Sequence, residues 1–379
     1  IMDFIISVLS IIFILSIPVF LHELGHFIAA RSVGIRVEKF YIGFNPWGLG
    51  KVVYKGKETE YGIGFLPLGG YVKVSGVIDE SMDSEGFGSE PKDYEFRSKN
   101  TFQKLWFLSA GVIMNFILSI IIFSVLFFAS GTYDLVQEPI IYKVSENINT
   151  YDMDANVVTV PSPAWEIGLR ENDRILTIND ITINTWSDIS NNLYNKGDMD
   201  VTIEWMTAQG YKKSSIVKLV SRPSFDKGKM INQGILGVQG NTIHRDLNFF
   251  ESIGKACEQT FQIITDIFYS LIGLITGEIS TKYMSGIVGI ANQAGEVAQS
   301  SGFISLIYFM AFISANLGLI NILPIPGLDG GHAFIAIIEG IMGRELPVQI
   351  QYTIQFLGIF LILSLFVFTI FNDIRNMFN

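Results

Sequence analysis

The sequence predicts a membrane protein, an α-helical transmembrane bundle of about four spans with a small β-rich domain inserted between them. Of its 379 residues, 49% are apolar and only 16% are charged, a composition typical of membrane proteins. Four stretches are long and apolar enough to cross a bilayer, which takes about 20 helical residues. Between the second and third stretches, short runs that alternate apolar and polar residues are typical of strands.

The four predicted spans cover residues 4–30, 105–130, 303–323 and 352–371. No small-residue cleavage site follows the first stretch, so we expect a retained helix and not a signal peptide. A fifth apolar stretch, 249–276, carries four charged side chains, and we expect it to lie along the membrane interface. The alternative is that part of it inserts into the membrane.

Basic residues in the short loops predict the orientation. Arg31, Arg36 and Lys39 follow the first span, whereas the segment after the second span, 131–142, contains no basic residue. The first loop, which also carries basic residues just before the second span, is therefore expected in the cytoplasm of a bacterial cell. Residues 131–302 and both termini are expected outside it, in the cytoplasmic (inner) membrane of that cell.

The predicted domain plan has four parts. A region with the first two spans is followed by a β-rich extracytoplasmic domain, a linker with the interfacial helix, and a region with the last two spans: 1–135, 136–223, 224–302 and 303–379. The net charge is −10, and no run of Lys or Arg could follow a phosphate backbone, which argues against a nucleic acid partner. The single cysteine, Cys257, excludes an internal disulfide.

A glycine-rich segment, 62–73, lies between the first two spans. Its glycines and Pro67 argue against a helix and favour strands joined by a turn, with room for another backbone to approach closely. A plain surface hairpin is the alternative, because glycine and proline occur in any hairpin.

His22, Glu23 and His26 lie within the first predicted span. Residues four apart share a helix face, so both imidazoles can bind one metal ion, and Glu23 can act as a base on water. Burying these side chains in lipid is expensive unless they are paired or bind something. The alternative is two histidines that are merely hydrogen-bonded within a helix bundle.

A catalytic zinc ion usually has three protein ligands, and Asp329 is the candidate for the third. It follows the third span after Pro324 and Pro326, which end the helix and allow a turn. The alternative role for Asp329 is to cap the next helix, expected from His332 onward. We expect His332 to be a supporting or capping residue and His244 to lie on the surface.

Together, the sequence His22-Glu23-Leu24-Gly25-His26, the run from Asn321 to Gly330 and the intervening domain resemble the site-2 protease family of intramembrane metalloproteases, in its bacterial RseP/RasP-like branch. The resemblance covers essentially the whole chain. It implies one Zn²⁺ held by His22, His26 and Asp329, with Glu23 as the catalytic base. It also implies substrate contacts from Asn316 and Asn321, and from a re-entrant β-loop that includes Gly62, Gly64, Phe65 and Gly70.

The inserted domain resembles a PDZ domain of this family, through residues 162–176 and Ile178-Asn179-Asp180. Many relatives carry two such domains in tandem, but the distance from Pro223 to Phe249 leaves room for one. The domain is expected either to restrict substrate access or to bind peptides.

The resemblance implies single-span membrane proteins as substrates, of the anti-sigma factor or signal-peptide-remnant type. Two other functions stay open. A membrane-anchored PDZ scaffold would bind partners without catalysis, and an ion or metal transporter would also place His, Glu and Asp within the membrane.

Overall fold

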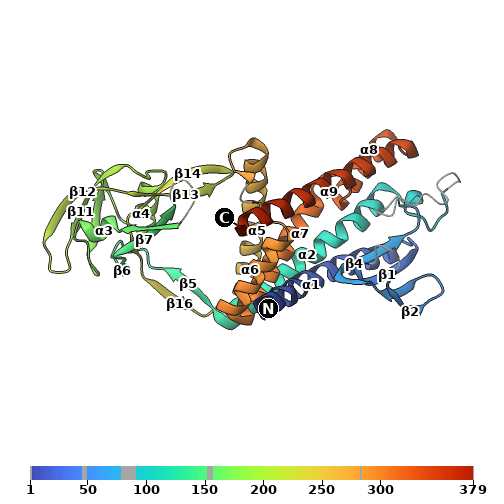
Figure 1. The fold of residues 1–379 in the computed structure, drawn as a ribbon, viewed down its shortest axis with the longest axis horizontal. Coiled ribbons are helices and arrows are strands. Elements are labelled where there is room, and N and C mark those ends of the chain that lie inside the picture. The colour runs from blue at the N-terminus through green and yellow to red at the C-terminus, as the bar shows by residue number, and fades with distance from the viewer. Residues whose placement is uncertain (1, 45–48, 78–90, 152–156, 282–283, 379) are drawn as a thin grey trace. The chain divides into compact units, whose positions relative to one another are not determined.

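The computed structural model describes residues 2–44, 49–77, 91–151, 157–281 and 284–378. The chain forms two compact units (Figure 1). The first unit comprises residues 1–127, 249–268 and 281–379, and the second comprises 128–248 and 269–280. The second unit is therefore an insertion into the first.

Long helices dominate the first unit: α1 (Met2–Ser32), α2 (Thr101–Ser130), α5 (Phe249–Thr276), α6 (Ile287–Ser300), α7 (Gly302–Ile322), α8 (Asp329–Met342) and α9 (Val348–Phe378). The last residues of α2 and of α5, 128–130 and 269–276, belong to the second unit. Among the described residues, four helical segments are long and apolar enough to cross a membrane: Met2–Ser32, Thr101–Ser130, Gly302–Ile322 and Val348–Arg375. The four predicted spans are thus confirmed as helices. The stretch 249–276 is also a helix, α5, and is not among these four.

Helices α1 and α2 cross with their backbones in close contact. A Cβ atom added at Gly25 of α1 would lie 2.5 Å from the carbonyl oxygen of Ala110 in α2, so only glycine fits at this crossing. Helix α7 packs against both helices. Its Met310 lies in a buried cluster with Ile14 of α1, and its Ser314 hydroxyl donates a 2.8 Å hydrogen bond to the Asn115 carbonyl of α2. These contacts fix α1, α2 and α7 around one another.

Four strands follow α1 and form one sheet in the order β2-β3-β1-β4: β1 (Val37–Phe44), β2 (Lys51–Lys55), β3 (Glu60–Ile63) and β4 (Leu66–Val74). A short 3₁₀ helix, Phe96–Ser98, precedes α2. Strand β1 pairs with β3 in parallel and with β4 in antiparallel orientation. The segment 62–73 thus forms parts of two strands joined by residues 64–65, as predicted, but β3 and β4 do not pair as a hairpin because they lie on opposite sides of β1. The sequence did not predict β1, which lies between them in the sheet.

The second unit is rich in β-structure. Its strands are β5 (Thr132–Leu135), β6 (Lys143–Val144), β7 (Asn147–Tyr151), β8 (Val157–Pro161), β9 (Arg174–Ile178), β10 (Ile181–Thr182), β11 (Asp200–Met206), β12 (Lys212–Lys218), β13 (Val220–Asp226), β14 (Lys229–Ile235), β15 (Val238–Gln239) and β16 (Thr242–Arg245), with short helices α3 (Pro163–Glu166) and α4 (Trp186–Leu193). The largest sheet has the order β10-β9-β11-β12. Its core includes the buried side chains of Ile175, Ile203 and Trp205.

This unit extends beyond the predicted domain end at residue 223. Strand β13 begins at Val220 and pairs along its whole length with β14, and β15 pairs with β6, so residues after 223 complete sheets that begin before it.

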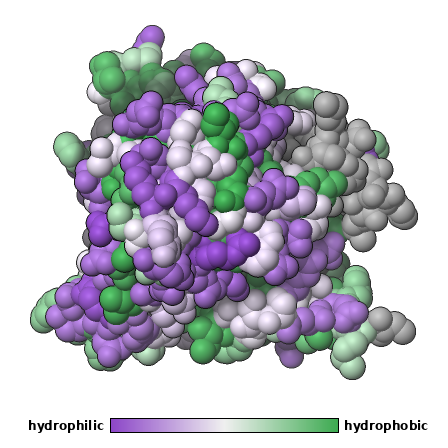
Figure 2. Space-filling model, turned by 90° about the vertical axis from the view of Figure 1, so that its left-hand side faces the viewer, coloured by the Kyte–Doolittle hydropathy of each residue, from purple (hydrophilic) through white to green (hydrophobic). Residues whose placement is uncertain are grey.

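The face seen in Figure 2 is mainly hydrophilic, with hydrophobic residues scattered over it. Such a surface is typical of a domain in contact with water.

Candidate metal centre

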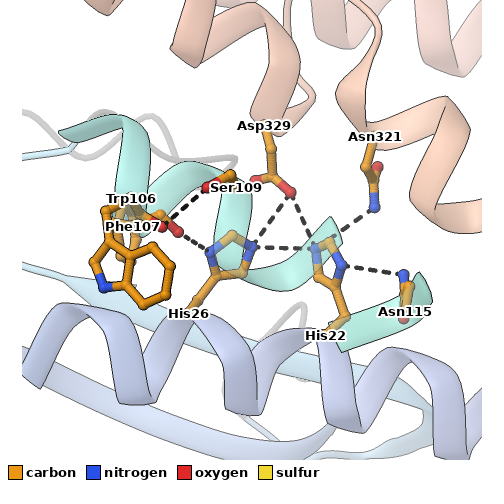
Figure 3. A network of polar contacts seen from close by, with 8 residues as sticks. All are labelled: His22, His26, Trp106, Phe107, Ser109, Asn115, Asn321 and Asp329. Carbon is orange, nitrogen blue, oxygen red and sulfur yellow. Dashed lines mark hydrogen bonds and ion pairs between the residues drawn. The ribbon is translucent and has the colours of Figure 1, made fainter. Parts of the chain in front are cut away.

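His22, His26 and Asp329 converge on one point in the first unit (Figure 3). The Nε2 atoms of the two histidines lie 3.1 Å apart. The Oδ2 atom of Asp329 lies 3.1 Å from Nε2 of His22 and 3.2 Å from Nε2 of His26. Both histidines are buried, and Asp329 is half-buried. The structure therefore brings together the three residues that the sequence predicted as ligands.

The turn between α7 and α8 places Asp329 at the histidines. Helix α7 ends at Ile322, and α8 begins at Asp329 itself, three residues earlier than predicted. A Cβ atom at Gly330 would lie 2.2 Å from the Leu323 carbonyl oxygen, so glycine lets the turn close tightly. The N-cap of α8 is Leu328, and Asp329 contacts the imidazoles. This geometry argues against capping as the role of Asp329.

The donor set fits a zinc ion. Zinc binds histidine nitrogens and carboxylate oxygens at about 2.0–2.2 Å, so three ligand atoms at tetrahedral angles lie about 3.3–3.5 Å apart. The three separations of 3.1–3.2 Å are within a few tenths of an ångström of this spacing. Two imidazoles and one carboxylate also leave the fourth position open, as in catalytic zinc sites.

Hydrogen bonds orient both imidazoles. Nδ1 of His26 donates a 2.9 Å bond to the Phe107 carbonyl, which leaves its Nε2 lone pair directed at the site. Nδ1 of His22 lies 3.2 Å from the side-chain amide of Asn115. Sequence reasoning missed Asn115, although an amide in the middle of an otherwise apolar span was a signal.

Helix α2 lies directly against the imidazoles. A Cβ atom at Gly111 would lie 2.5 Å from Nε2 of His26 and 2.6 Å from Cε1 of His22. Glycine at this position therefore makes room for the histidine pair.

Glu23 and strand β4 line the same cavity, of about 480 Å³, as the three candidate ligands. The Glu23 carboxylate accepts a hydrogen bond from the Val72 backbone N–H of β4. A Cβ atom at Gly70 would lie 2.7 Å from Cγ of Glu23, so glycine lets β4 approach the carboxylate-bearing side chain. Gly70 thus lines the candidate site, and its contact with a substrate stays a prediction.

The other glycines predicted in the β-loop lie elsewhere. Gly62 is on the inner strand β3, where a Cβ atom would lie 2.3 Å from the buried ring of Tyr41. Gly64 donates its backbone N–H to the Ile42 carbonyl, and the Phe65 side chain is exposed. None of these three is among the described residues that line the cavity. Glycine is needed at position 62 because the Tyr41 ring fills the space of a side chain, and β3 is paired on both sides, so Gly62 offers no free strand edge. The substrate contacts predicted for Gly64 and Phe65 stay predictions.

The two asparagines of α7 differ. Asn321 lines the cavity, and its Nδ2 lies 3.5 Å from Nε2 of His22. Asn316 is not among the described lining residues, and its buried Oδ1 has no hydrogen-bond partner in the described part of the chain. His332 lines the cavity, whereas His244 is exposed in the second unit, where it bonds to the Ser130 carbonyl.

A family match and individual relatives agree on the kind of protein that this chain resembles. A profile described as "Peptidase family M50" matches residues 10–365. A protein of Clostridium acetobutylicum is 33% identical over 94% of this chain and 94% of its own length, and one of Campylobacter jejuni is 34% identical over 98% and 94%. A protein of Agrobacterium fabrum is 31% identical over 98% of this chain and 96% of its own length. Each of the three is named a "putative zinc metalloprotease".

Proposed function

Because the chain belongs to peptidase family M50, we propose that it is a zinc-dependent endopeptidase that cuts other membrane proteins within their membrane-spanning segments. The relatives are named as zinc metalloproteases, and four helices here are able to span a membrane. The convergence of two imidazole nitrogens and one carboxylate oxygen within 3.2 Å of one another carries the proposal.

In this proposal His22, His26 and Asp329 hold the zinc ion, and Glu23 is the catalytic base. When bound, zinc supplies Lewis-acid chemistry that makes water a nucleophile near neutral pH. Glu23, in the same cavity, takes the proton from the attacking water and passes it to the departing amide nitrogen. The Val72 N–H holds the Glu23 carboxylate in place before reaction.

The substrate segment binds as an extended strand against β4. Peptide bonds in a transmembrane helix are already hydrogen-bonded, so cleavage requires local unwinding, and irregular backbone at membrane depth is tolerated only within protein or a water-filled cavity. Strand β4 is at one end of the sheet order and lines the cavity through Gly70, Tyr71 and Val72. Pairing with an outer strand replaces the helical hydrogen bonds that the substrate loses. In this proposal the side-chain amide of Asn321, which lines the cavity, donates a hydrogen bond to a substrate carbonyl.

The chain is a multi-pass membrane protein, and we place it in the cytoplasmic membrane of a bacterium. The basic residues that flank the loop between α1 and α2 support a cytoplasmic position for that loop. The second unit and both termini then lie outside the cytoplasm. We also propose that the second unit is a PDZ-like domain. In this proposal it acts as a filter that excludes bulky substrates.

Substrates are single-span membrane proteins such as anti-sigma factors or signal-peptide remnants. Purified wild type and Glu23→Gln protein are compared first for zinc content and for cleavage of a synthetic single-span peptide. Both proteins are expected to hold one zinc ion per chain, and only the wild type to cut. A zinc-free wild type, or a Glu23→Gln protein that cuts at the wild-type rate, contradicts the proposal.

The same pair of proteins identifies the substrate. Each is expressed in cells, and single-span proteins that accumulate only with Glu23→Gln are found by mass spectrometry of the membrane fraction. A membrane-anchored scaffold without catalysis predicts identical membrane proteomes for the two.

A further inference from the structure

Asn115 is a buried amide at the centre of α2. The residue is 1% exposed, and the Ser314 hydroxyl of α7 donates a hydrogen bond to its backbone carbonyl. Nδ2 lies 3.2 Å from Nδ1 of His22, and Oδ1 has no hydrogen-bond partner in the part of the chain that the structure describes. Leaving a buried polar atom without a partner costs about 1–3 kcal/mol. This cost in folding free energy suggests that Asn115 has a functional role.

The position of the proton on His22 decides what Asn115 can do. A neutral imidazole carries one proton, on Nδ1 or on Nε2. Nε2 of His22 faces Asp329 and His26, whereas Nδ1 faces the Asn115 amide (Figure 3). With the proton on Nε2, Nε2–H donates to Asp329 and Nδ1 accepts from the Asn115 Nδ2–H. The contacts in Figure 3 that this arrangement uses are those of Nε2 with Asp329 and of Nδ1 with the Asn115 Nδ2.

A metal ion on Nε2 requires the other tautomer. The Nε2 lone pair is then occupied, so the proton must be on Nδ1, which becomes a donor. The Asn115 amide cannot donate to it. However, the oxygen and nitrogen of an amide exchange places when the group turns by 180°, at almost no change in shape. After this turn Oδ1 faces Nδ1–H at the distance that Nδ2 has now.

We propose that Asn115 is a positioning residue whose amide turns with the tautomer of His22, accepting from Nδ1–H when zinc is bound and donating to Nδ1 when it is absent. This inference rests on the proposed function, because it takes His22 as a zinc ligand. An amide suits both states since it carries a donor and an acceptor on one planar group. Partners of this kind fix the orientation of a ligating imidazole, and their loss lowers metal affinity about 10- to 100-fold.

Two substitutions separate hydrogen bonding from packing. Asn115→Leu keeps a similar volume but has neither donor nor acceptor, and is expected to weaken Zn²⁺ binding about 10- to 100-fold. Asn115→Asp keeps the shape and the acceptor, and is expected to bind Zn²⁺ at least as tightly as the wild type. Ser314→Ala is the matched control, because it removes the neighbouring buried hydrogen bond between α7 and α2 and leaves the amide in place.

The measurement is the Zn²⁺ dissociation constant of full-length protein in detergent, from competition with a chromophoric chelator. A wild-type constant for Asn115→Leu, or an equal loss for Asn115→Asp and Asn115→Leu, overturns the inference. If the wild type binds no Zn²⁺, the proposed function fails as well. If the wild type binds Zn²⁺ and Asn115→Leu binds it equally tightly, the proposed function stands and this inference alone is lost.

A second measurement uses the wild-type protein alone, so it does not depend on whether a substituted protein folds. The sequence contains four histidines, so the nitrogen NMR spectrum of ¹⁵N-histidine-labelled wild type is simple. We expect His22 to carry its proton on Nδ1 in the Zn²⁺-loaded protein and on Nε2 in the metal-free protein. A zinc-loaded His22 without a proton on Nδ1 contradicts the inference.

Discussion

Replacing Gly111 by alanine tests the metal centre through a residue that is not itself a ligand. The added Cβ atom would lie 2.5 Å from Nε2 of His26, 2.6 Å from Cε1 of His22 and 2.7 Å from its Nδ1. Ordinary van der Waals contact begins near 3.4 Å, so the imidazoles must move by close to an ångström. Metal–ligand distances tolerate only about 0.2 Å. We therefore expect Gly111→Ala to weaken Zn²⁺ binding by at least about tenfold and to lower peptidase activity with it.

The assay is zinc per chain by elemental analysis, with a chelator-competition constant, on protein purified in detergent. Alanine in a helix is about 0.5–1 kcal/mol more favourable than glycine, so an effect on helix propensity alone would stabilise α2. Gly254→Ala is the matched control, because this glycine of α5 has nothing within 4 Å of the added Cβ. Wild-type zinc affinity in Gly111→Ala would show that the imidazoles are not held against α2 as described.

Three further substitutions test other parts of the structure. Gly70→Ala places a Cβ atom 2.7 Å from Cγ of Glu23, so zinc is expected to stay bound while kcat falls about 100-fold or more; unchanged turnover speaks against Glu23 as the base. Lys104→Met leaves the Glu339 carboxylate, now 3.2 Å from the Lys104 ammonium, buried without its cation, and should cost about 3–5 kcal/mol. A lowered thermal unfolding midpoint in detergent measures this, and an unchanged midpoint contradicts it. Thr185→Ala removes the N-cap of α4 and should cost about 1 kcal/mol, seen as faster proteolysis of the second unit; equal proteolysis rates refute it.

The membrane helices and the residues of the candidate metal centre could be predicted from the sequence because each depends on local chemistry. Span length follows from apolar runs, and the spacing of His22 and His26 places both on one helix face. Asp329 was a candidate because prolines and glycines around it indicated a turn within the membrane region. The structure adds that its carboxylate contacts both imidazoles.

The arrangement of the sheet could not be predicted in the same way. Strand β1 pairs with β3 and β4, which are neighbours in sequence but not in the sheet. Pairing of this kind depends on contacts between residues 21 to 37 positions apart. The sequence analysis interpreted the glycines of 62–73 as one strand edge that another backbone could approach. In the structure Gly62 accommodates the Tyr41 ring, and only Gly70 approaches Glu23.

Asn115 shows a different limit. Its role depends on which imidazole nitrogen faces α2, a matter of helix rotation that apolar periodicity does not determine. The end of the inserted unit was predicted too early for a similar reason, because the pairing of β15 with β6 joins segments almost 100 residues apart.

The separation of His26 and Asp329 by 303 positions has a consequence for biosynthesis. A ribosome completes α1 long before it reaches α8, so the emerging polypeptide carries two histidines and a glutamate in lipid without their acidic partner. Under the proposed function, in which these two histidines and Asp329 hold one zinc ion, the polypeptide is therefore inert toward its neighbours until α8 has been made. Cleavage then begins only once Asp329 has reached the two histidines of α1.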